Sequence, residues 1–274
     1  KRCKSLLALV LFCLIQGFTE FLPISSQGHL IIFNSIYPID NYAGISIHEA
    51  TIIAHFGSLL AIITFYRRAL LGLLFSIKMI DRPDIDKNSF ILINLVISTI
   101  PIMVAGYVIF KILDYDWDGL LLIIAISSIF FGIILFLADK FCLRIKNQNS
   151  LNYVMSFLIG VFQCIALIPG VSRSGAILTI MRFFGFQRQF SVEYSNLLSI
   201  PVIIGAMIFM ILNSSFDSSF GSLINFHTSI IFFLSFFFSI IFIYFLVMWV
   251  KRFSLLIFVV YRVSFGLWIL LTLI

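Results

Sequence analysis

Long apolar stretches with almost no charge constrain this chain more than any other feature. Four of them run without a break, at 90–110, 120–138, 229–250 and 254–274. A helix needs ~20 residues, at a rise of about 1.5 Å each, to cross the hydrocarbon core of a bilayer. Hydrophobic residues make up 61% of the 274 residues and charged residues 11%, against roughly 45–50% and about 25% in soluble domains. The sequence therefore predicts an all-α polytopic membrane protein.

Six segments are long enough to span a bilayer: 47–66, 90–110, 120–138, 191–212, 228–250 and 254–274. Two further apolar regions are interrupted. Pro23 and the polar patch after it break the region 5–36, and the Pro169-Gly170 turn with its polar neighbours breaks the region 151–184. Pro and Gly end helices, and backbone groups freed in lipid must face protein or water. Each region is therefore predicted to be a re-entrant helix hairpin.

The distribution of positive charge predicts the orientation. Twelve of the 18 lysines and arginines lie in four regions: 67–87, 140–146, 182–188 and 251–252. The connections between them, 37–46, 111–119 and 213–226, hold one lysine and several aspartates. Because Lys and Arg accumulate in cytoplasmic loops, the first set is predicted to be inside. Lys1, Arg2 and Lys4 fall outside in this scheme and oppose it.

This orientation predicts an inverted-topology repeat within one membrane domain. Residues 1–145 form a hairpin plus three spans that start outside, and residues 146–274 form a hairpin plus three spans that start inside. A faint sequence echo agrees with the repeat, because Gln16 and Gln163 each precede a glycine by twelve residues, with a serine three residues before that glycine.

Composition also limits the partners. The net charge of +6 comes from residues between hydrophobic segments, so membrane orientation explains it better than binding to nucleic acid does. No pair of the four cysteines has CxxC spacing, so they are interpreted as small apolar residues. Membrane lipids are the expected surroundings.

Ionisable residues at membrane depth cost roughly 2.5–3.5 kcal/mol each on insertion, so each one needs a reason. The candidates are Glu20, His29, Glu49, His55, Arg173 and Arg262. If the two hairpin turns meet, the polar residues of the first (Glu20, Ser25, Ser26, Gln27, His29) converge with those of the second (Gly170, Ser172, Arg173, Ser174). Arginine and turn amides bind phosphate, a carboxylate binds Mg²⁺ or Ca²⁺, and Ser with His supplies a nucleophile and proton transfer.

Structural roles are the alternative for most of these residues. Serines in membrane helices more often bond to the backbone than react. His55, Glu49 and Arg262 fit a structural polar network as well as they fit a site. Gln16 is a weak cation ligand because its amide is neutral. Arg173, in a broken hairpin, is the residue most indicative of function.

Two long motifs resemble those of the bacterial undecaprenyl-pyrophosphate phosphatase, or bacitracin-resistance protein, family. The first is QGFTEFLPISSQGH at 16–29, and the second is PGVSRSG at 169–175. The resemblance extends to HFGSLLA at 55–61, Glu193-Tyr194-Ser195 and Tyr261-Arg262, and so covers nearly the whole chain.

The resemblance implies a hydrolase that converts undecaprenyl pyrophosphate to undecaprenyl phosphate and so recycles the lipid carrier of cell-wall synthesis. It also implies a divalent cation (Mg²⁺ or Ca²⁺), a homodimer, and a site open to the outer face of the bacterial inner membrane. Glu20 matches the metal-associated carboxylate, Ser26 the proposed nucleophile, His29 the catalytic histidine and Arg173 the phosphate-binding arginine. Gln16 stands where some members have Glu, and Gln27 and Ile177 replace hydroxyl-bearing or small residues.

Two alternatives stay open. The type 2 phosphatidic acid phosphatases also use Ser-Gly-His and Ser-Arg elements, but here no histidine follows Arg173 before His227. A lipid or solute transporter, or a flippase, is the alternative of a different class, because inverted repeats with midplane hairpins are a transporter architecture. A direct attack by His29, in place of Ser26, is also open.

Overall fold

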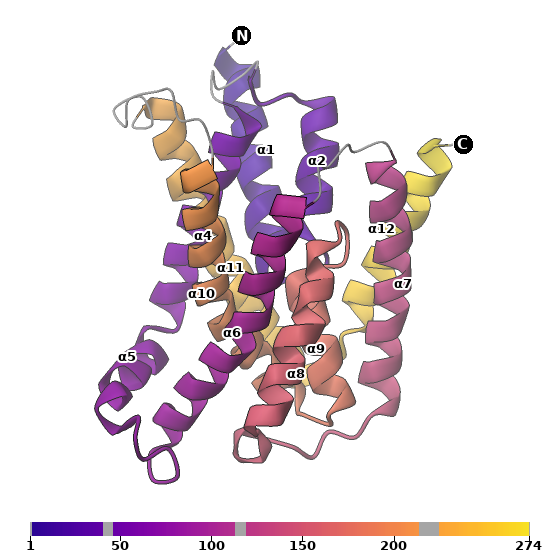
Figure 1. Ribbon diagram of the computed structural model, residues 1–274. Helices are drawn as coiled ribbons and strands as arrows, with labels where there is room; N and C mark the ends of the chain where they lie inside the picture. The colour runs from indigo at the N-terminus through magenta and orange to yellow at the C-terminus, as the bar shows by residue number, and fades with distance from the viewer. Residues whose placement is uncertain (1, 41–45, 113–118, 214–224, 274) are drawn as a thin grey trace.

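The computed structural model describes residues 2–40, 46–112, 119–213 and 225–273. Within these ranges the chain is helical, with a single isolated bridge between Lys146 and Phe186. The helices are α1 (Arg2–Phe21), α2 (Ser26–Ile36), α4 (Ile47–Phe65), α5 (Arg67–Ser76), α6 (Lys87–Ile112), α7 (Leu120–Phe141), α8 (Tyr153–Gln163), α9 (Arg173–Phe183), α10 (Arg188–Asn213), α11 (Phe226–Arg252) and α12 (Leu256–Leu273) (Figure 1).

The six predicted spans are confirmed as helices. The helices long and apolar enough to cross a membrane are α4, α6, α7, α10, α11 and α12, and each overlaps one predicted segment. Helix α5 differs from expectation, because the charges at 67–87 suggested only a loop. Its sequence RRALLGLLFS is rich in strong helix formers, and it packs against α6.

Both interrupted regions form helix hairpins. Helices α1 and α2 pack together around a turn at 22–25, and α8 continues as a short 3-10 helix, Cys164–Leu167, before the turn that leads to α9. Helix α9 lies beside α8 near the middle of the molecule (Figure 1). Entry of these hairpins into the membrane and return to the same side stays a prediction.

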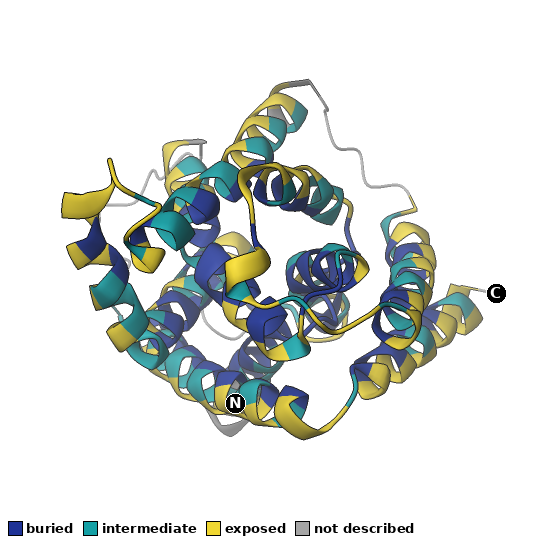
Figure 2. Cartoon of the chain, turned by 90° about the horizontal axis from the view of Figure 1, so that it is seen from below, coloured by how far each residue is buried: buried dark blue, intermediate teal, exposed yellow. Residues whose placement is uncertain are grey.

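The outer surface of the bundle is apolar. Seen along the helices, buried residues face the interior and exposed residues face outward (Figure 2). The exposed residues include Phe130 at 57%, Phe233 at 66% and Leu271 at 74%. Water would penalise such a surface, whereas lipid does not. The chain is therefore a multi-pass membrane protein.

Small residues let the helices approach closely. A Cβ on Gly57 of α4 would lie 2.5 Å from the Phe232 carbonyl oxygen of α11. Nearby, the hydroxyls of Ser58 and Ser239 hydrogen bond at 2.9 Å. A Cβ on Gly160 of α8 would lie 2.5 Å from the Ser98 carbonyl oxygen of α6. These contacts fix the hairpins and their neighbours in register.

The helix pairs have a reciprocal arrangement. Helix α1 packs on α11 while α8 packs on α6, and α7 pairs with α12 as α4 does with α10. Two inverted repeats give this arrangement if α1 and α8 are counterparts. The repeat, with its boundary at 145–146, stays a prediction.

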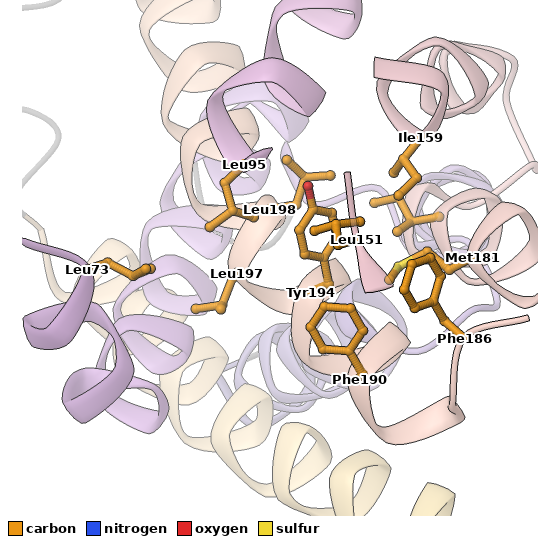
Figure 3. Close-up of a cluster of buried hydrophobic side chains, with 11 residues drawn as sticks. Leu73, Leu95, Leu151, Ile159, Met181, Phe186, Phe190, Tyr194, Leu197 and Leu198 are labelled. Atoms are coloured by element: carbon orange, nitrogen blue, oxygen red, sulfur yellow. The ribbon is translucent and has the colours of Figure 1, made fainter. Parts of the chain in front are cut away.

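A buried cluster anchors the second hairpin. It joins side chains of α5, α6, α8, α9 and α10 (Figure 3). Tyr194 lies in this cluster, and its hydroxyl bonds to the Ser98 hydroxyl at 2.8 Å and to the Asn94 carbonyl at 2.9 Å. Buried polar groups are satisfied here, as a low-dielectric interior requires.

A second anchor surrounds Asp139 near the end of α7. Its carboxylate accepts from Arg182 at 3.1 Å, from Arg188 at 2.7 Å through two nitrogens, and from the Leu255 amide at 3.1 Å. The Asp139 cluster, defined as Asp139, Arg182 and Arg188, joins α7, α9 and α10 to the start of α12.

Candidate active site

A pocket lies between the two hairpin turns. Its lining comes from both hairpins and from α4: Thr19, Glu20, Ser25, Ser26, Gln27, His55, Ala166, Ile168, Ser172 and Arg173. Its volume of about 130 Å³ would hold about four waters at roughly 30 Å³ each. Drug-sized ligand sites begin near roughly 300 Å³, so this pocket fits a compact polar group.

Glu20 and Arg173 form an ion pair across the pocket. The distance from Arg173 Nη2 to Glu20 Oε1 is 3.4 Å, and the two side chains are 16% and 6% exposed. The other terminal nitrogen of Arg173, Nη1, is buried and has no hydrogen-bond partner. An arginine with a free buried nitrogen can still accept an oxyanion, because guanidinium binds phosphate through several donors.

Gln16 and His55 complete the surroundings of Glu20. The Gln16 amide nitrogen lies 3.1 Å from Glu20 Oε2 and 2.9 Å from His55 Nδ1. The His55 nitrogen is itself 3.6 Å from the same carboxylate oxygen. His55 thus belongs to the site, although the sequence left its role open between site and structure.

The first turn of α2 faces the pocket. Ser25 precedes the helix with a positive φ of 75° and makes no side-chain cap. Ser26 and Gln27, the first two residues of α2, line the pocket. The first amides of an uncapped helix lack intrahelical acceptors, so this turn offers N–H donors and a positive dipole end to an anion.

The first turn of α9 has the same backbone but more internal bonding. Ser172 has a φ of 70°, and its hydroxyl accepts from the Gly175 amide at 3.2 Å. Ser174, predicted to bind substrate, instead donates to the Leu22 carbonyl at 2.9 Å. Ser174 therefore ties the two hairpins together and does not line the pocket.

His29 lies behind the pocket. Its Nδ1 is 2.7 Å from the Ser25 carbonyl oxygen and its Nε2 is 2.8 Å from the Tyr261 hydroxyl. A carbonyl only accepts, so Nδ1 carries the proton and Nε2 accepts from tyrosine. The ring also stacks on Phe265 at 3.9 Å between centroids. In this arrangement the imidazole holds the α2 turn.

Arg262 holds both turns from the opposite side. It is 1% exposed, and it donates to the carbonyls of Gly170 at 3.0 Å, Val171 at 2.8 Å and Pro23 at 3.5 Å. Gly170 has a φ of 91°, and a Cβ there would lie 2.1 Å from the Ser127 hydroxyl. Gly170 was predicted to bind substrate; in the structure its carbonyl is held by Arg262 and it does not line the pocket.

The donor set was compared with the needs of a divalent cation. Across the described residues no group of three His, Cys, Asp or Glu side chains could hold a metal ion. Mg²⁺, however, is often bound by one or two carboxylates together with substrate phosphates, and Glu20 in the pocket fits that pattern. Gln16 presents nitrogen to Glu20, and its Oε1 is buried without a partner. That oxygen would reach a cation only after the amide rotates.

Two other candidates have structural surroundings. Glu49 forms a capping box with Ser46 at the start of α4, which explains this carboxylate. A larger hollow of about 330 Å³ is lined by Lys87, Glu193 and several amide side chains. It contains none of the residues that the two long motifs contribute to the site.

Comparisons with known proteins agree with the motifs. The family described as Bacitracin resistance protein BacA matches residues 9–268. An undecaprenyl-diphosphatase of Pelagibacter ubique is 38% identical over 264 residues, covering 95% of this chain and 94% of that protein. One from Clavibacter michiganensis is 34% identical over 276 residues, covering 98% and 97%. One from Leptospira interrogans is 32% identical over 268 residues, covering 94% of each.

Proposed function

The chain belongs to the bacitracin resistance protein BacA family, and from that premise we propose that it is an undecaprenyl-diphosphatase. It hydrolyses undecaprenyl pyrophosphate to undecaprenyl phosphate and inorganic phosphate. This reaction returns the lipid carrier of cell-wall synthesis to use. The relatives named above carry the same activity in their names.

The observation that carries the proposal is the convergence of Arg173, Ser26 and Glu20 in one pocket. Arg173 comes from the second hairpin, and the other two come from the first. The free Nη1 of Arg173 and the uncapped first turn of α2 supply donors for phosphate oxygens. Catalysis of phosphoryl transfer depends mainly on such positioning and on neutralising charge.

The pocket admits the headgroup of the substrate and leaves the prenyl chain outside. Its volume of about 130 Å³ is far too small for a long isoprenoid. Ile168 lies at the pocket and is 45% exposed, and the surface of the bundle is apolar. The chain is therefore expected to lie along helix surfaces in the bilayer, where its burial is favourable.

The reaction is proposed to begin with attack by the Ser26 hydroxyl on the terminal phosphorus. The new oxygen–phosphorus bond forms as the bond to the bridging oxygen breaks, and the prenyl monophosphate leaves with that oxygen. His29 follows Ser26 by three residues on the same helix face and takes the serine proton on Nε2. That nitrogen must first release the Tyr261 hydroxyl. Water then cleaves the phosphoserine and frees inorganic phosphate.

A divalent cation, Mg²⁺ or Ca²⁺, is proposed at Glu20. When bound, the cation would neutralise charge on the phosphate oxygens. Glu20 would hold it from the pocket wall, with Gln16 as a second contact. Ser25, Gln27 and Ser172 would bind the remaining phosphate oxygens, since all three line the same pocket.

The finer setting is also a proposal. We place the protein in the bacterial inner membrane as a homodimer, with the pocket open to the outer face. The outward opening rests on the distribution of Lys and Arg between connections. The homodimer rests on the family resemblance.

The test is release of inorganic phosphate from a long-chain prenyl pyrophosphate by the purified protein in detergent, with and without a chelator. Arg173→Ala is expected to lower kcat roughly 100- to 1,000-fold, the usual loss for one transition-state donor. Arg173→Lys is expected to recover little, because a point charge does not replace a bidentate fork. Ser26→Ala is expected to abolish turnover.

Arg68→Ala is the matched control, since Arg68 is exposed on α5 and should leave the rate unchanged. Release that survives Ser26→Ala but not His29→Ala would move the nucleophile to the imidazole. If the monodisperse wild-type protein released no phosphate with either cation, the phosphatase proposal would fail and a transporter would become the working hypothesis.

A further inference from the structure

His55 is a second histidine at the site, contributed by a spanning helix. It lies on α4, 35 residues after Glu20 in the sequence, and it lines the pocket beside Arg173 and Ser26. Its side chain is 23% exposed. His29, in contrast, does not line the pocket, and both of its ring nitrogens are engaged.

The contacts of Gln16 determine which nitrogen of His55 carries the proton. The Gln16 amide group that lies 3.1 Å from Glu20 must be the NH₂, because an amide oxygen there would oppose a carboxylate oxygen. That NH₂ also lies 2.9 Å from His55 Nδ1. With one hydrogen donated to each partner, Nδ1 accepts, so the neutral ring carries its proton on Nε2.

The Nε2–H of His55 is thus a donor that the described hydrogen bonds leave unused. The anionic group nearest to the ring is Glu20, which is already bonded to Gln16 and Arg173. A ligand in the pocket is therefore the natural acceptor. The pocket already presents Arg173 and the first turn of α2 to an oxyanion.

We propose that His55 is a phosphate-binding residue, which donates Nε2–H to an oxygen of the substrate pyrophosphate while Gln16 fixes its tautomer. The proposal rests on the proposed function, because it takes the occupant of the pocket to be a pyrophosphate headgroup. It adds an arm from the spanning helix α4 to a site otherwise built from hairpin turns. Gln16 acquires a defined role as the residue that orients the imidazole.

The experiment is steady-state kinetics of phosphate release on purified His55→Leu, His55→Gln and His48→Leu proteins. His55→Leu removes the donor and is expected to raise KM about 10- to 100-fold, the range for a lost hydrogen bond to a charged group. His55→Gln keeps an N–H donor and should stay within about threefold of wild type. His48 is exposed on the same helix and outside the pocket, so His48→Leu should behave as wild type.

A spectroscopic reading accompanies the kinetics. Nitrogen-15 NMR of the histidine rings should show the Nε2–H tautomer for His55 in wild type and a mixture of tautomers in Gln16→Met. An unchanged KM in His55→Leu would overturn the proposal, and so would equal losses of kcat in His55→Leu and His55→Gln. If wild type itself released no phosphate, the proposed function would fail; a normal wild type with an unaffected His55→Leu would refute only the role of His55.

Discussion

At two positions a serine holds a backbone conformation that L-residues rarely adopt. Ser25 has a φ of 75° and Ser172 a φ of 70°, and each directly precedes the helix that faces the pocket. A side chain in this region costs roughly 1–2 kcal/mol relative to glycine. Such strain persists only where the surroundings hold it, often at functional sites. Here His29 holds the first turn through the Ser25 carbonyl, and Arg262 holds both turns.

This strain predicts an inverted order of stability. Ser172→Gly and Ser172→Ala both remove the cap to Gly175, but only Gly also relieves the positive φ. Ser172→Gly is therefore expected to be more stable than Ser172→Ala by about 1 kcal/mol. The midpoint of unfolding in detergent measures this difference.

Ser35 supplies the control, because it is exposed within helix α2. There Ala should be more stable than Gly by about 0.8–1 kcal/mol. The same order at both sites, with Ala above Gly, would contradict strain at Ser172.

The sequence predicted the residues with strong local motifs and left others open. Glu20, Ser26 and Arg173 stood in the two long motifs, and the structure brings them together. Arg262 has main-chain carbonyls as partners, and carbonyls leave no signature in a sequence. The place of His29 behind the pocket likewise depends on Tyr261, a residue far along the chain that only folding brings close.

At the scale of elements, a hairpin is positioned by the helix on which it packs. Helix α8 touches α6 at Gly160, and α9 begins at Arg173, a few residues beyond the end of α8. Displacing α8 would therefore carry the α9 turn, and Arg173 with it, away from Glu20.

Gly160→Ala tests this coupling. The new Cβ would lie 2.5 Å from the Ser98 carbonyl oxygen and 2.9 Å from Pro101, so the helices must separate. Overpacking of this kind costs about 1–3 kcal/mol. We expect a lower unfolding midpoint together with a lower kcat for phosphate release.

Gly106→Ala is the comparison, because a Cβ there meets only Leu167, at 3.9 Å. This variant should keep both stability and rate. Wild-type stability and rate in Gly160→Ala would show that the α8–α6 contact does not position the site.

The elements differ in how far the sequence revealed them. Hydropathy sufficed for the spans because a bilayer demands ~20 apolar residues, and Pro23 and Pro169 marked the breaks. Helix α5 was missed because Arg67 and Arg68 indicated a polar connection, whereas the leucines that follow favour a helix. Its packing on α6 is a tertiary contact that local pattern does not encode.

At the scale of the whole molecule, the Asp139 cluster holds one end of the bundle together. Arg182 is fully buried at 0% exposure, and Asp139 is 4% exposed. Arg182 and Arg188 belong to the positive charges that were used to predict orientation. Part of that charge thus serves packing, which a count of loop charges cannot distinguish.

Asp139→Ala should destabilise the fold strongly. It leaves the buried Arg182 without its carboxylate, and removing one partner of a buried pair typically costs about 3–5 kcal/mol. The unfolding midpoint in detergent should fall well below that of wild type. The surface pair Asp81–Arg82, separated by 3.9 Å with both side chains more than half exposed, provides the control.

Asp81→Ala should change stability by less than about 1 kcal/mol. Equal midpoints for the two variants would mean that the Asp139 cluster does not secure the bundle.

The small volume of the pocket also determines how the enzyme meets its substrate. Only the headgroup fits into about 130 Å³, so the prenyl chain stays dissolved in the bilayer throughout the encounter. Diffusion toward the pocket is then two-dimensional, and the effective concentration is the mole fraction of substrate among lipids rather than its molarity. Expanding the membrane area around a fixed amount of substrate would slow turnover as dilution slows a soluble enzyme.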